Sequence, residues 1–284
     1  MNKLKFTVIG GDLRSAFACR YLKEKGFEAD TFLLDDAPVL SDDEKRDAFP
    51  YSDCYILGLP AADEHALISA PLSRRSLSVK DFFSLVPKNS HVSGGLLSGE
   101  FYEFAKEKNI RLSDYYRSEE LQIKNSVPTA EGAIEIAMRE MPVTLAGSNV
   151  LIIGYGRIAR ALIPMMTSLG AFVSVSTRNP DSLAWCSVSG CEPIAPSELD
   201  KKIGSFDLII NTAPARVLEG DILDCISSDA LIIDLASRPG GVDIKAASLK
   251  GLHVIWALGL PGKCAPVTAG RIIAGTVLNI INGR

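Results

Sequence analysis

The sequence predicts an α/β protein with two mostly parallel sheets, each covered by helices on both faces. Strand-like apolar runs alternate with helix-like segments along nearly the whole chain. Two of these runs lead directly into glycine turns, Gly10-Gly11-Asp12 and Gly154-Tyr155-Gly156. The 284 residues, 47% of them hydrophobic, are sufficient for two cores.

The first half has the pattern of a Rossmann-like or flavodoxin-like domain. Its first glycine turn lacks the full dinucleotide fingerprint, and the second strand leads into an acidic stretch at 35–47. We therefore expect this domain to share the fold without nucleotide chemistry, and the acidic stretch to be a solvated loop and short helix. The expected elements are strands 4–9, 27–34, 54–57, 90–93 and 110–112, and helices 13–25, 79–86 and 99–108.

Residues 115–141 resemble two helices broken at residues 125–128. Pro128 suits the first turn of a new helix, with Ser126 or Val127 near its cap and Glu131 in its opening turn. The second helix then leads into the next domain.

The second half repeats the alternation of strands and helices. After the strand at 150–153, strands are expected at 206–211, 230–234 and 253–256, with turns at their carboxyl ends. The apolar helix at 266–281 is expected to pack back on the first domain, with a ligand cleft between the domains. The predicted domains are residues 1–141 with 266–284, for the substrate, and residues 142–265, for the nucleotide.

The turn after residue 153 carries a dinucleotide-binding pattern. Gly154 allows the tight turn, Gly156 lets a pyrophosphate approach the backbone, and Ala159 keeps the helix close to the strand. Tyr155, Arg157 and Ile158 complete the predicted cofactor loop. The competing interpretation is an ordinary strand-to-helix turn, but a second strand follows at the proper distance.

The end of that second strand predicts which cofactor binds. An NAD site places a carboxylate there, whereas this chain has Ser176, Thr177 and Arg178. A cation and two hydroxyl groups suit a 2′-phosphate, so we expect NADP. In the alternative interpretation Arg178 only starts a solvated loop. Further cofactor contacts are predicted at the ends of later strands, from Thr212, Ala213, Pro214 and Asp234.

Composition excludes several other functions. The net charge of −4 provides no basic face for nucleic acid. No apolar run reaches the roughly 18 residues of a membrane span, and the first residues lack a signal-peptide pattern, so a cytosolic protein is expected. The six cysteines form no metal-ligand pattern, and packed thiols are the default.

Four motifs carry a resemblance over nearly the whole chain. GGDLR (10–14), NSVPTAEGAI (125–134), DLASRPGGVD (234–243) and GLPGKCAPVTAGRIIA (259–274) resemble the dipicolinate synthase A-subunit family of spore-forming bacteria. The overall plan is similar to that of D-2-hydroxyacid dehydrogenases. The resemblance implies NADP-dependent formation of dipicolinate, the flavoprotein B-subunit of dipicolinate synthase as partner, and the cytoplasm of the mother cell. The family more often has glycine where this chain has Ala159.

A dicarboxylate substrate requires cations and free backbone N–H groups. Arg14, Arg238 and Lys263 are the candidate cations, and a plain surface charge is the alternative for each. Asp12 lies in the first glycine turn. Gly94 and Gly95 would let substrate approach the backbone or would only form a turn.

The motif at 125–134 supplies the remaining candidates. Asn125, Ser126 and Thr129 would hydrogen-bond substrate or cap a helix, and Glu131 would be a weak general base or a capping carboxylate. Lys263 is the second candidate catalytic residue. Surface or structural roles are favoured for the three histidines, at 65, 91 and 253.

Three functions remain open at this stage. The first is NADP-dependent oxidation of a cyclic dicarboxylate. The second is a non-catalytic NADP-sensing or scaffolding role, and the third is another dehydrogenase-like enzyme or one that cycles an internal NAD. A homo-oligomer is compatible with the helical segment 115–141 and the apolar tail.

Overall fold

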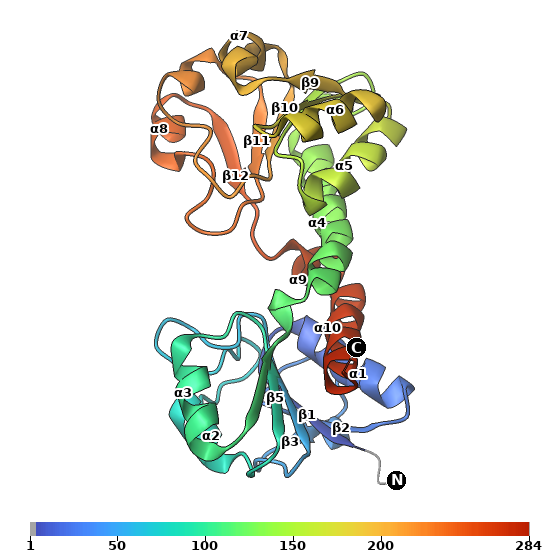
Figure 1. The fold of residues 1–284 in the computed structure, drawn as a ribbon, viewed down its shortest axis with the longest axis vertical. Helices are drawn as coiled ribbons and strands as arrows, with labels where there is room; N and C mark the ends of the chain where they lie inside the picture. Colours follow the sequence, from blue (N-terminus) through green and yellow to red (C-terminus); the bar gives the residue numbers. More distant parts are fainter. Residues whose placement is uncertain (1–3, 284) are drawn as a thin grey trace. The chain divides into compact units, whose positions relative to one another are not determined.

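The computed structural model describes residues 4–283, which form two compact units. Of the described residues, the first unit comprises 4–125 and 261–283, and the second comprises Ser126–Leu260. Helix α4 (Glu119–Glu140) and the short helix α9 (Leu260–Cys264) each include residues of both units. Figure 1 shows the two sheets and labels many of their helices and strands.

The first unit contains a six-stranded sheet in the order β3-β2-β1-β4-β5-β6, with every neighbouring pair parallel. Its strands are β1 (Lys5–Ile9), β2 (Glu28–Phe32), β3 (Lys45–Arg46), β4 (Cys54–Leu57), β5 (His91–Gly94) and β6 (Arg111–Asp114). Its helices are α1 (Leu13–Glu24), α2 (Val79–Leu85), α3 (Gly99–Lys108) and α10 (Pro266–Ile281), with short 3₁₀ turns η1 (Asp42–Glu44) and η2 (Tyr115–Arg117).

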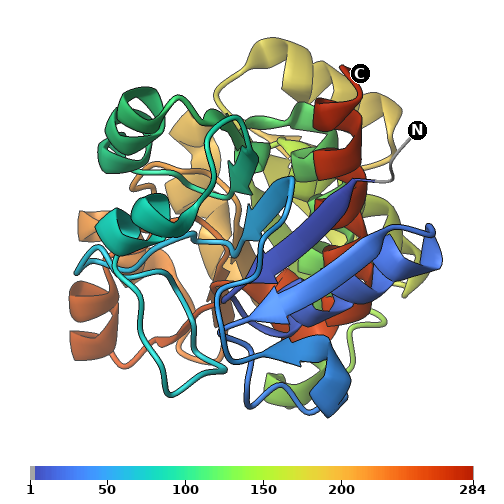
Figure 2. The same ribbon diagram turned by 90° about the horizontal axis from the view of Figure 1, so that it is seen from below.

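Both faces of this sheet are buried because alternate residues of its strands enter different cores. Phe6 and Val8 pack with α1 and α10, whereas Ile9 packs with α2 and α3. Helix α10 lies alongside α1 in both views of the ribbon (Figures 1 and 2). A Cβ at Gly270 would lie 2.5 Å from the Arg14 carbonyl oxygen, so glycine permits this close helix approach.

The second unit repeats the plan with the strand order β12-β11-β10-β7-β8-β9, again parallel throughout. Its strands are β7 (Asn149–Ile153), β8 (Phe172–Ser176), β9 (Glu192–Ile194), β10 (Leu208–Asn211), β11 (Leu231–Asp234) and β12 (His253–Trp256). Its helices are α5 (Arg157–Ser168), α6 (Pro180–Val188), α7 (Leu199–Lys202) and α8 (Ile244–Leu249), with η3 (Pro196–Glu198), η4 (Ile203–Ser205) and η5 (Gly220–Cys225).

The order of the strands confirms the predicted fold class. Counted from the first strand of each unit, both sheets follow the doubly wound order 3-2-1-4-5-6. Such sheets bind ligands outside the carboxyl ends of their strands, where the strand order reverses. These switch points lie between β1 and β4 in the first unit and between β7 and β10 in the second.

The predicted break at Pro128 is wrong, because α4 is one continuous helix from Glu119 to Glu140. Proline removes one helical hydrogen bond and crowds the preceding turn, at a cost of about 3 kcal/mol. Burial on both sides of it offsets this cost, since Leu121, Ala130 and Ala133 are completely buried. The helix-start positions predicted for residues 126–131 are therefore interior positions of a helix.

Candidate functional site

The glycine turn after β7 opens onto free space. Gly154 has φ of +96°, and its N–H donates to the Ser176 carbonyl at 2.8 Å. Gly156 begins α5 with no side-chain cap, and a Cβ built on it would meet nothing within 4 Å. Ala159, in the first turn of α5, is buried against the core. The start of this helix therefore leaves backbone N–H groups directed at the space beside the turn.

The carboxyl end of β8 supplies the second wall. Ser176 is buried, Thr177 is half-buried and Arg178 is exposed. Among residues 4–283 the Arg178 guanidinium has no ion pair or hydrogen-bond partner. The solvated loop considered for this position is short, because Asn179 already caps helix α6 by accepting a hydrogen bond from the Asp181 N–H at 2.9 Å.

The carboxyl end of β10 supplies the third wall. The Thr212 hydroxyl donates to the Ile153 carbonyl at 2.9 Å and lies 2.6 Å from where a Cβ on Gly154 would be. Thr212 therefore holds the end of β10 against the glycine turn. Pro214 is exposed.

These three segments line one cavity of about 490 Å³. Of the predicted cofactor residues, it contains Gly154, Ala213 and the run Ser176, Thr177 and Arg178. It also contains Arg216, which the sequence-based prediction missed. The available signal was its place four residues beyond Thr212, on a loop at the same sheet edge as Arg178.

Asp234 is placed differently from the other predicted cofactor residues, because it is completely buried. Its Oδ1 accepts from the Asn211 amide at 2.7 Å and from the Ala236 N–H at 3.0 Å. Its Oδ2 accepts from the Gly241 N–H at 2.7 Å. The carboxylate thus holds both ends of the loop at 235–241 to the sheet.

Arg238 lies exposed on this loop, between the two ends that Asp234 binds. Gly240 has φ of +88°, and a Cβ there would lie 3.0 Å from Asp234 Oδ2. The Trp256 indole N–H donates to the Ala236 carbonyl at 2.8 Å. The buried contacts of Asp234 and Trp256 therefore hold the loop in place, and the loop carries an exposed cation at the carboxyl edge of the second sheet.

The first glycine turn is closed by its own chain. The Gly11 N–H donates to the Ser69 carbonyl at 2.6 Å, and a Cβ on Gly10 would lie 2.4 Å from that oxygen. A Cβ on Gly58, at the end of β4, would lie 2.7 Å from the Gly11 Cα. Backbone atoms therefore fill the position that a phosphate takes in a nucleotide-binding turn.

Asp12 and Arg14 neutralise each other beside this turn. Arg14 Nε is 2.9 Å from Asp12 Oδ1, and Arg14 Nη2 donates to the Leu59 carbonyl at 2.6 Å. The Arg14 side chain is only 11% exposed. A Cβ on Gly262 would lie 2.9 Å from both Arg14 Nε and Asp12 Oδ2, so α9 packs directly over the pair.

Gly94 and Gly95 are buried beneath side chains of the first unit. A Cβ on Gly94 would lie 2.5 Å from Leu97 Cδ2, and one on Gly95 would lie 2.6 Å from Leu59 Cδ1. Packing alone therefore requires small residues here.

Lys263, on α9, is exposed.

The candidates on α4 do not share one face. Successive residues of a helix are about 100° apart, so Asn125, Ser126 and Thr129 fall within about 100° of one another. Glu131 lies about 200° around the axis from Thr129, and it is exposed. The structure thus brings the three polar residues together and directs Glu131 away from them.

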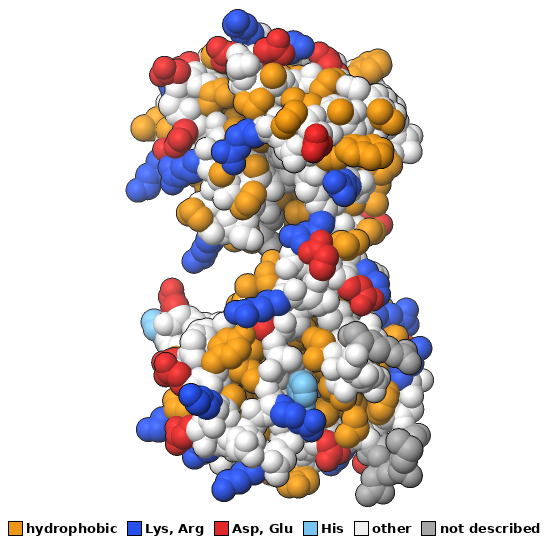
Figure 3. Space-filling view, in the orientation of Figure 1, with side chains coloured by type: hydrophobic (Ala, Val, Ile, Leu, Met, Phe, Trp, Pro, Cys, Tyr) orange, Lys and Arg blue, Asp and Glu red, His pale blue; other side chains and the backbone are white. Residues whose placement is uncertain are grey.

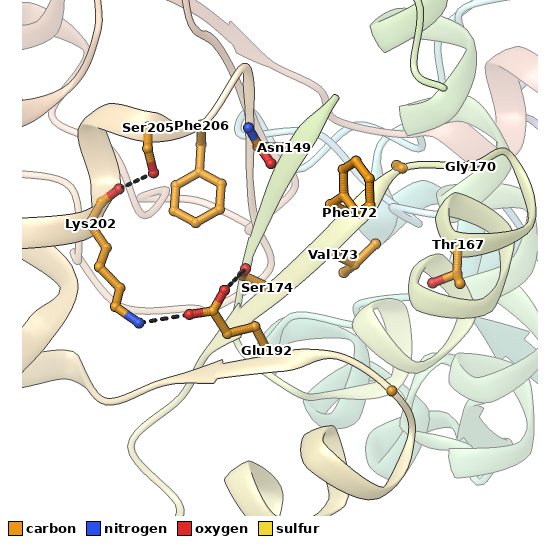
Figure 4. A pocket seen from close by; sticks show the side chains of 12 residues that line it. Asn149, Thr167, Gly170, Phe172, Val173, Ser174, Glu192, Lys202, Ser205 and Phe206 are labelled. Atoms are coloured by element: carbon orange, nitrogen blue, oxygen red, sulfur yellow. Dashed lines mark hydrogen bonds and ion pairs between the residues drawn. The ribbon is translucent and has the colours of Figure 1, made fainter. Parts of the chain in front are cut away.

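A larger cavity, of about 720 Å³, lies at the opposite edge of the second sheet (Figure 4). Its lining includes Asn149 and Phe172, the first residues of β7 and β8, so it opens at the amino ends of the strands. Two of its lining residues form an ion pair, with Lys202 Nζ 2.7 Å from Glu192 Oε1. The cofactor binding predicted from the glycine turn is expected at the smaller cavity, because α/β sheets bind cofactors at the carboxyl ends of their strands.

Histidine and cysteine chemistry is restrained by burial. Burial, together with the Arg111 charge, lowers the pKa of His91, whose Nε2 lies 2.8 Å from Ser113 Oγ. Burial raises the pKa of Cys19 to about 12 and that of Cys54 to about 11. These thiols stay protonated at neutral pH and are poor nucleophiles.

Within residues 4–283, no three His, Cys, Asp or Glu side chains cluster as metal ligands would. No helix among these residues has the length and apolar character needed to cross a bilayer. On the face shown in Figure 3, Lys and Arg side chains are interspersed with Asp and Glu.

Known proteins match the chain over its whole length. A family model described as the N-terminal domain of the dipicolinate synthase A-subunit matches residues 5–116. The dipicolinate synthase A-subunit of Bacillus subtilis (strain 168) is 32% identical over 289 aligned positions, covering 99% of this chain and 97% of that protein. The crystal structure of the dipicolinate synthase A-subunit from Bacillus halodurans is 29% identical with a TM-score of 0.88, covering 99% of each chain.

Two more distant matches bear on the fold and on one segment. Transhydrogenase from Sinorhizobium meliloti has a TM-score of 0.73 at 16% identity, covering 98% of this chain and 93% of that one, and shows the shared fold. A shikimate dehydrogenase (NADP(+)) of Methanothrix thermoacetophila is 33% identical over 87 residues, which is 30% of this chain and 32% of that protein.

Proposed function

Because the chain belongs to the dipicolinate synthase A-subunit family, we propose that it is an NADP-dependent oxidoreductase that forms dipicolinate from a dihydrodipicolinate-type cyclic dicarboxylate. The flavoprotein B-subunit of dipicolinate synthase is the proposed partner. The proposal places the reaction in dipicolinate synthesis during sporulation, in the cytoplasm.

The open glycine turn of the second unit carries this proposal. The space beside Gly156, the uncapped start of α5 and the adjoining cavity fit a dinucleotide whose pyrophosphate lies against backbone N–H groups. Residues 154–159 would hold the pyrophosphate, and Ala213 and Pro214 would border the bound cofactor. A nicotinamide bound there would supply the hydride acceptor for the oxidation.

Arg178 supports NADP over NAD. It is exposed, lines the cavity, and has no partner among the described residues. A guanidinium in this position forms charge-assisted hydrogen bonds with a phosphate, and no carboxylate at the end of β8 competes for the ribose. The segment match to an NADP(+) enzyme is consistent with this choice.

The reaction removes a hydride and a proton from a dihydropyridine ring and yields an aromatic ring. Because aromaticity is gained, the step depends more on the position of the substrate than on a strong base. The protein's proposed contribution is therefore to hold two carboxylates in place. A strongly activated base is not needed, which agrees with the orientation of Glu131 away from the polar residues of α4.

Among the candidate cations, Arg238 and Lys263 are the better carboxylate ligands. Both are exposed and have no ion pair among residues 4–283. Arg14 already shares its charge with Asp12 and donates to a carbonyl. We therefore propose Arg14 and Asp12 as a pair that supports α9, and Asp234 as a residue that positions the Arg238 loop.

Enzyme activity tests the proposed substrate. The full chain is combined with its flavoprotein partner and the dihydropyridine dicarboxylate, and NADPH and dipicolinate are followed by their absorbance. We expect equal amounts of the two products. Arg238→Ala and Lys263→Ala, tested separately, should raise KM about tenfold while NADP⁺ affinity is unchanged.

Two results would reject parts of this proposal. If no dipicolinate forms, the substrate assignment fails. If NADP⁺ binds tightly but is never reduced, the chain has a sensing or scaffolding role instead. Arg139→Ala, which removes an exposed arginine ion-paired within α4, serves as the control variant.

A further inference from the structure

We propose that Arg216 is a second cation for the 2′-phosphate of NADP, and that Asp243 is its partner when no phosphate is bound. This inference rests on the proposed preference for NADP. It adds a specificity-determining residue from a part of the chain that the nucleotide fingerprint does not include.

Arg216 and Arg178 line the same cavity from different segments. Arg178 follows β8, and Arg216 lies on the loop after β10. Residues 176–179, residue 213 and residues 215–217 therefore border one space of about 490 Å³. A phosphate bound beside Arg178 would have the Arg216 side chain within the same cavity.

The ion pair between Arg216 and Asp243 is weak. Its Nη1 lies 3.3 Å from Asp243 Oδ2, and the two side chains are 47% and 31% exposed. This distance is long for a charge-assisted hydrogen bond, and exposed ion pairs contribute little to stability. A phosphate, with a charge near −2, can therefore replace Asp243 as the partner of Arg216 at small cost.

The surroundings leave the side chain free to make this exchange. The backbone next to it is fixed, because the Val217 and Leu218 N–H groups donate to the Gly241 carbonyl at 3.0 and 3.1 Å. Asp243 is fixed as well, since its Oδ1 accepts from the Ala246 N–H at 3.1 Å and caps α8. Only the Arg216 side chain has to turn.

Two adenosine probes separate a phosphate ligand from other roles. The full chain is titrated calorimetrically with adenosine 2′,5′-bisphosphate and with AMP, which lacks the 2′-phosphate. The variants are Arg178→Ala, Arg216→Ala and Asp243→Asn, with Arg139→Ala as the control. Asparagine is a good helix cap, so Asp243→Asn removes the charge and keeps α8.

We expect Arg216→Ala to weaken bisphosphate binding about tenfold and to leave AMP binding unchanged. Asp243→Asn should strengthen bisphosphate binding about two- to fivefold, because it releases Arg216. Thermal unfolding should show that both variants are folded.

The outcomes distinguish this inference from the proposed cofactor preference. If Arg178→Ala weakens bisphosphate binding and Arg216→Ala has no effect, the inference about Arg216 is wrong and the NADP preference stands. Equal losses of both probes in Arg216→Ala would show contact with the adenosine or the 5′-phosphate that both probes share, and would also overturn it. If the parent protein binds the two probes equally, the NADP preference and this inference both fail.

Discussion

The two units have the same strand order and a glycine turn at the same topological position, yet only one turn is open. In the first unit the Ser69 carbonyl accepts the Gly11 N–H, and Gly58 contacts the turn. In the second unit the Thr212 hydroxyl packs against Gly154, but nothing lies within 4 Å of a Cβ on Gly156, where α5 begins. The same fold therefore provides a glycine turn in both units, and the segments packed around the turn determine whether it is open to a ligand.

The ends of the second strands differ in the same way. Beyond β2, the Asp35 carboxylate binds Arg75 Nε at 3.0 Å and Ser73 Oγ at 2.5 Å. Beyond β8, Arg178 has no partner among residues 4–283. The first unit thus carries the carboxylate typical of a ribose site but uses it internally, whereas the second leaves a cation available.

The largest expected effect comes from filling the open turn. Gly156→Val places a side chain where the pyrophosphate is proposed to bind, so we expect NADP⁺ affinity to fall about 100-fold or more. Stability should fall by no more than about 1 kcal/mol, because Gly156 has φ of −86° and open space around it. Calorimetric titration and urea unfolding measure the two effects.

Gly10→Ala changes a glycine of the closed turn in the first unit. Its Cβ would meet the Ser69 oxygen at a φ of +58°, so we expect a loss of about 2 kcal/mol or more in unfolding free energy. NADP⁺ affinity should not change below the unfolding temperature. Loss of nucleotide binding in this variant, with Gly156→Val silent, would assign the nucleotide to the other unit and contradict our account.

The next effect concerns the choice of cofactor. Arg178→Asp introduces the carboxylate that NAD sites use, so we expect NADP⁺ affinity to fall about 10- to 100-fold and NAD⁺ affinity to be retained or increased. Both dissociation constants are measured in parallel. Equal changes for the two cofactors would mean that Arg178 does not contact the 2′-phosphate.

A smaller effect is expected from the ion pair between Asp35 and Arg75, which lies beyond β2 in the first unit. Burial alone would raise the pKa of Asp35, but the hydrogen bonds from Arg75 and Ser73 keep it below its ordinary value of 3.8. The stabilisation this carboxylate provides is therefore present above that value and is lost as the pH falls through the lower pKa of the folded protein.

Arg75→Met should accordingly lower the unfolding free energy by about 1 kcal/mol at neutral pH, a value reduced for the partial exposure of the pair. The difference from the parent should shrink as the pH falls below the ordinary value of 3.8, as measured by urea unfolding at each pH. NADP⁺ affinity should be unchanged. A difference that is independent of pH would show that Arg75 acts by packing on Phe32 or through its hydrogen bonds to the Asp47 and Arg46 carbonyls, and not through Asp35.

Local patterns predicted most of the fold, because buried parallel strands are continuous apolar runs and the glycine fingerprint joins two of them. The run Val150–Ile153 followed by Gly154 is an example, and β7 ends where that prediction places it. The open turn and the exposed Arg178 belong to this predictable part.

What local patterns could not predict depends on distant contacts. Ser69 closes the first turn from a distant loop, Arg75 reaches Asp35 across 40 residues, and packing on both sides keeps Pro128 inside a helix. Asp234 ends an apolar strand as a cofactor ligand would, but its carboxylate is buried and accepts hydrogen bonds from the Asn211 amide and from two loop N–H groups. Arg216 lies outside any fingerprint.

The most direct test of the central claim is a parallel titration of the parent protein with NADP⁺ and NAD⁺. If the second unit's open turn and Arg178 form an NADP site, NADP⁺ should bind at least about tenfold more tightly, and added salt should reduce the difference. Equal affinity for both cofactors, or no binding of either, would contradict the account.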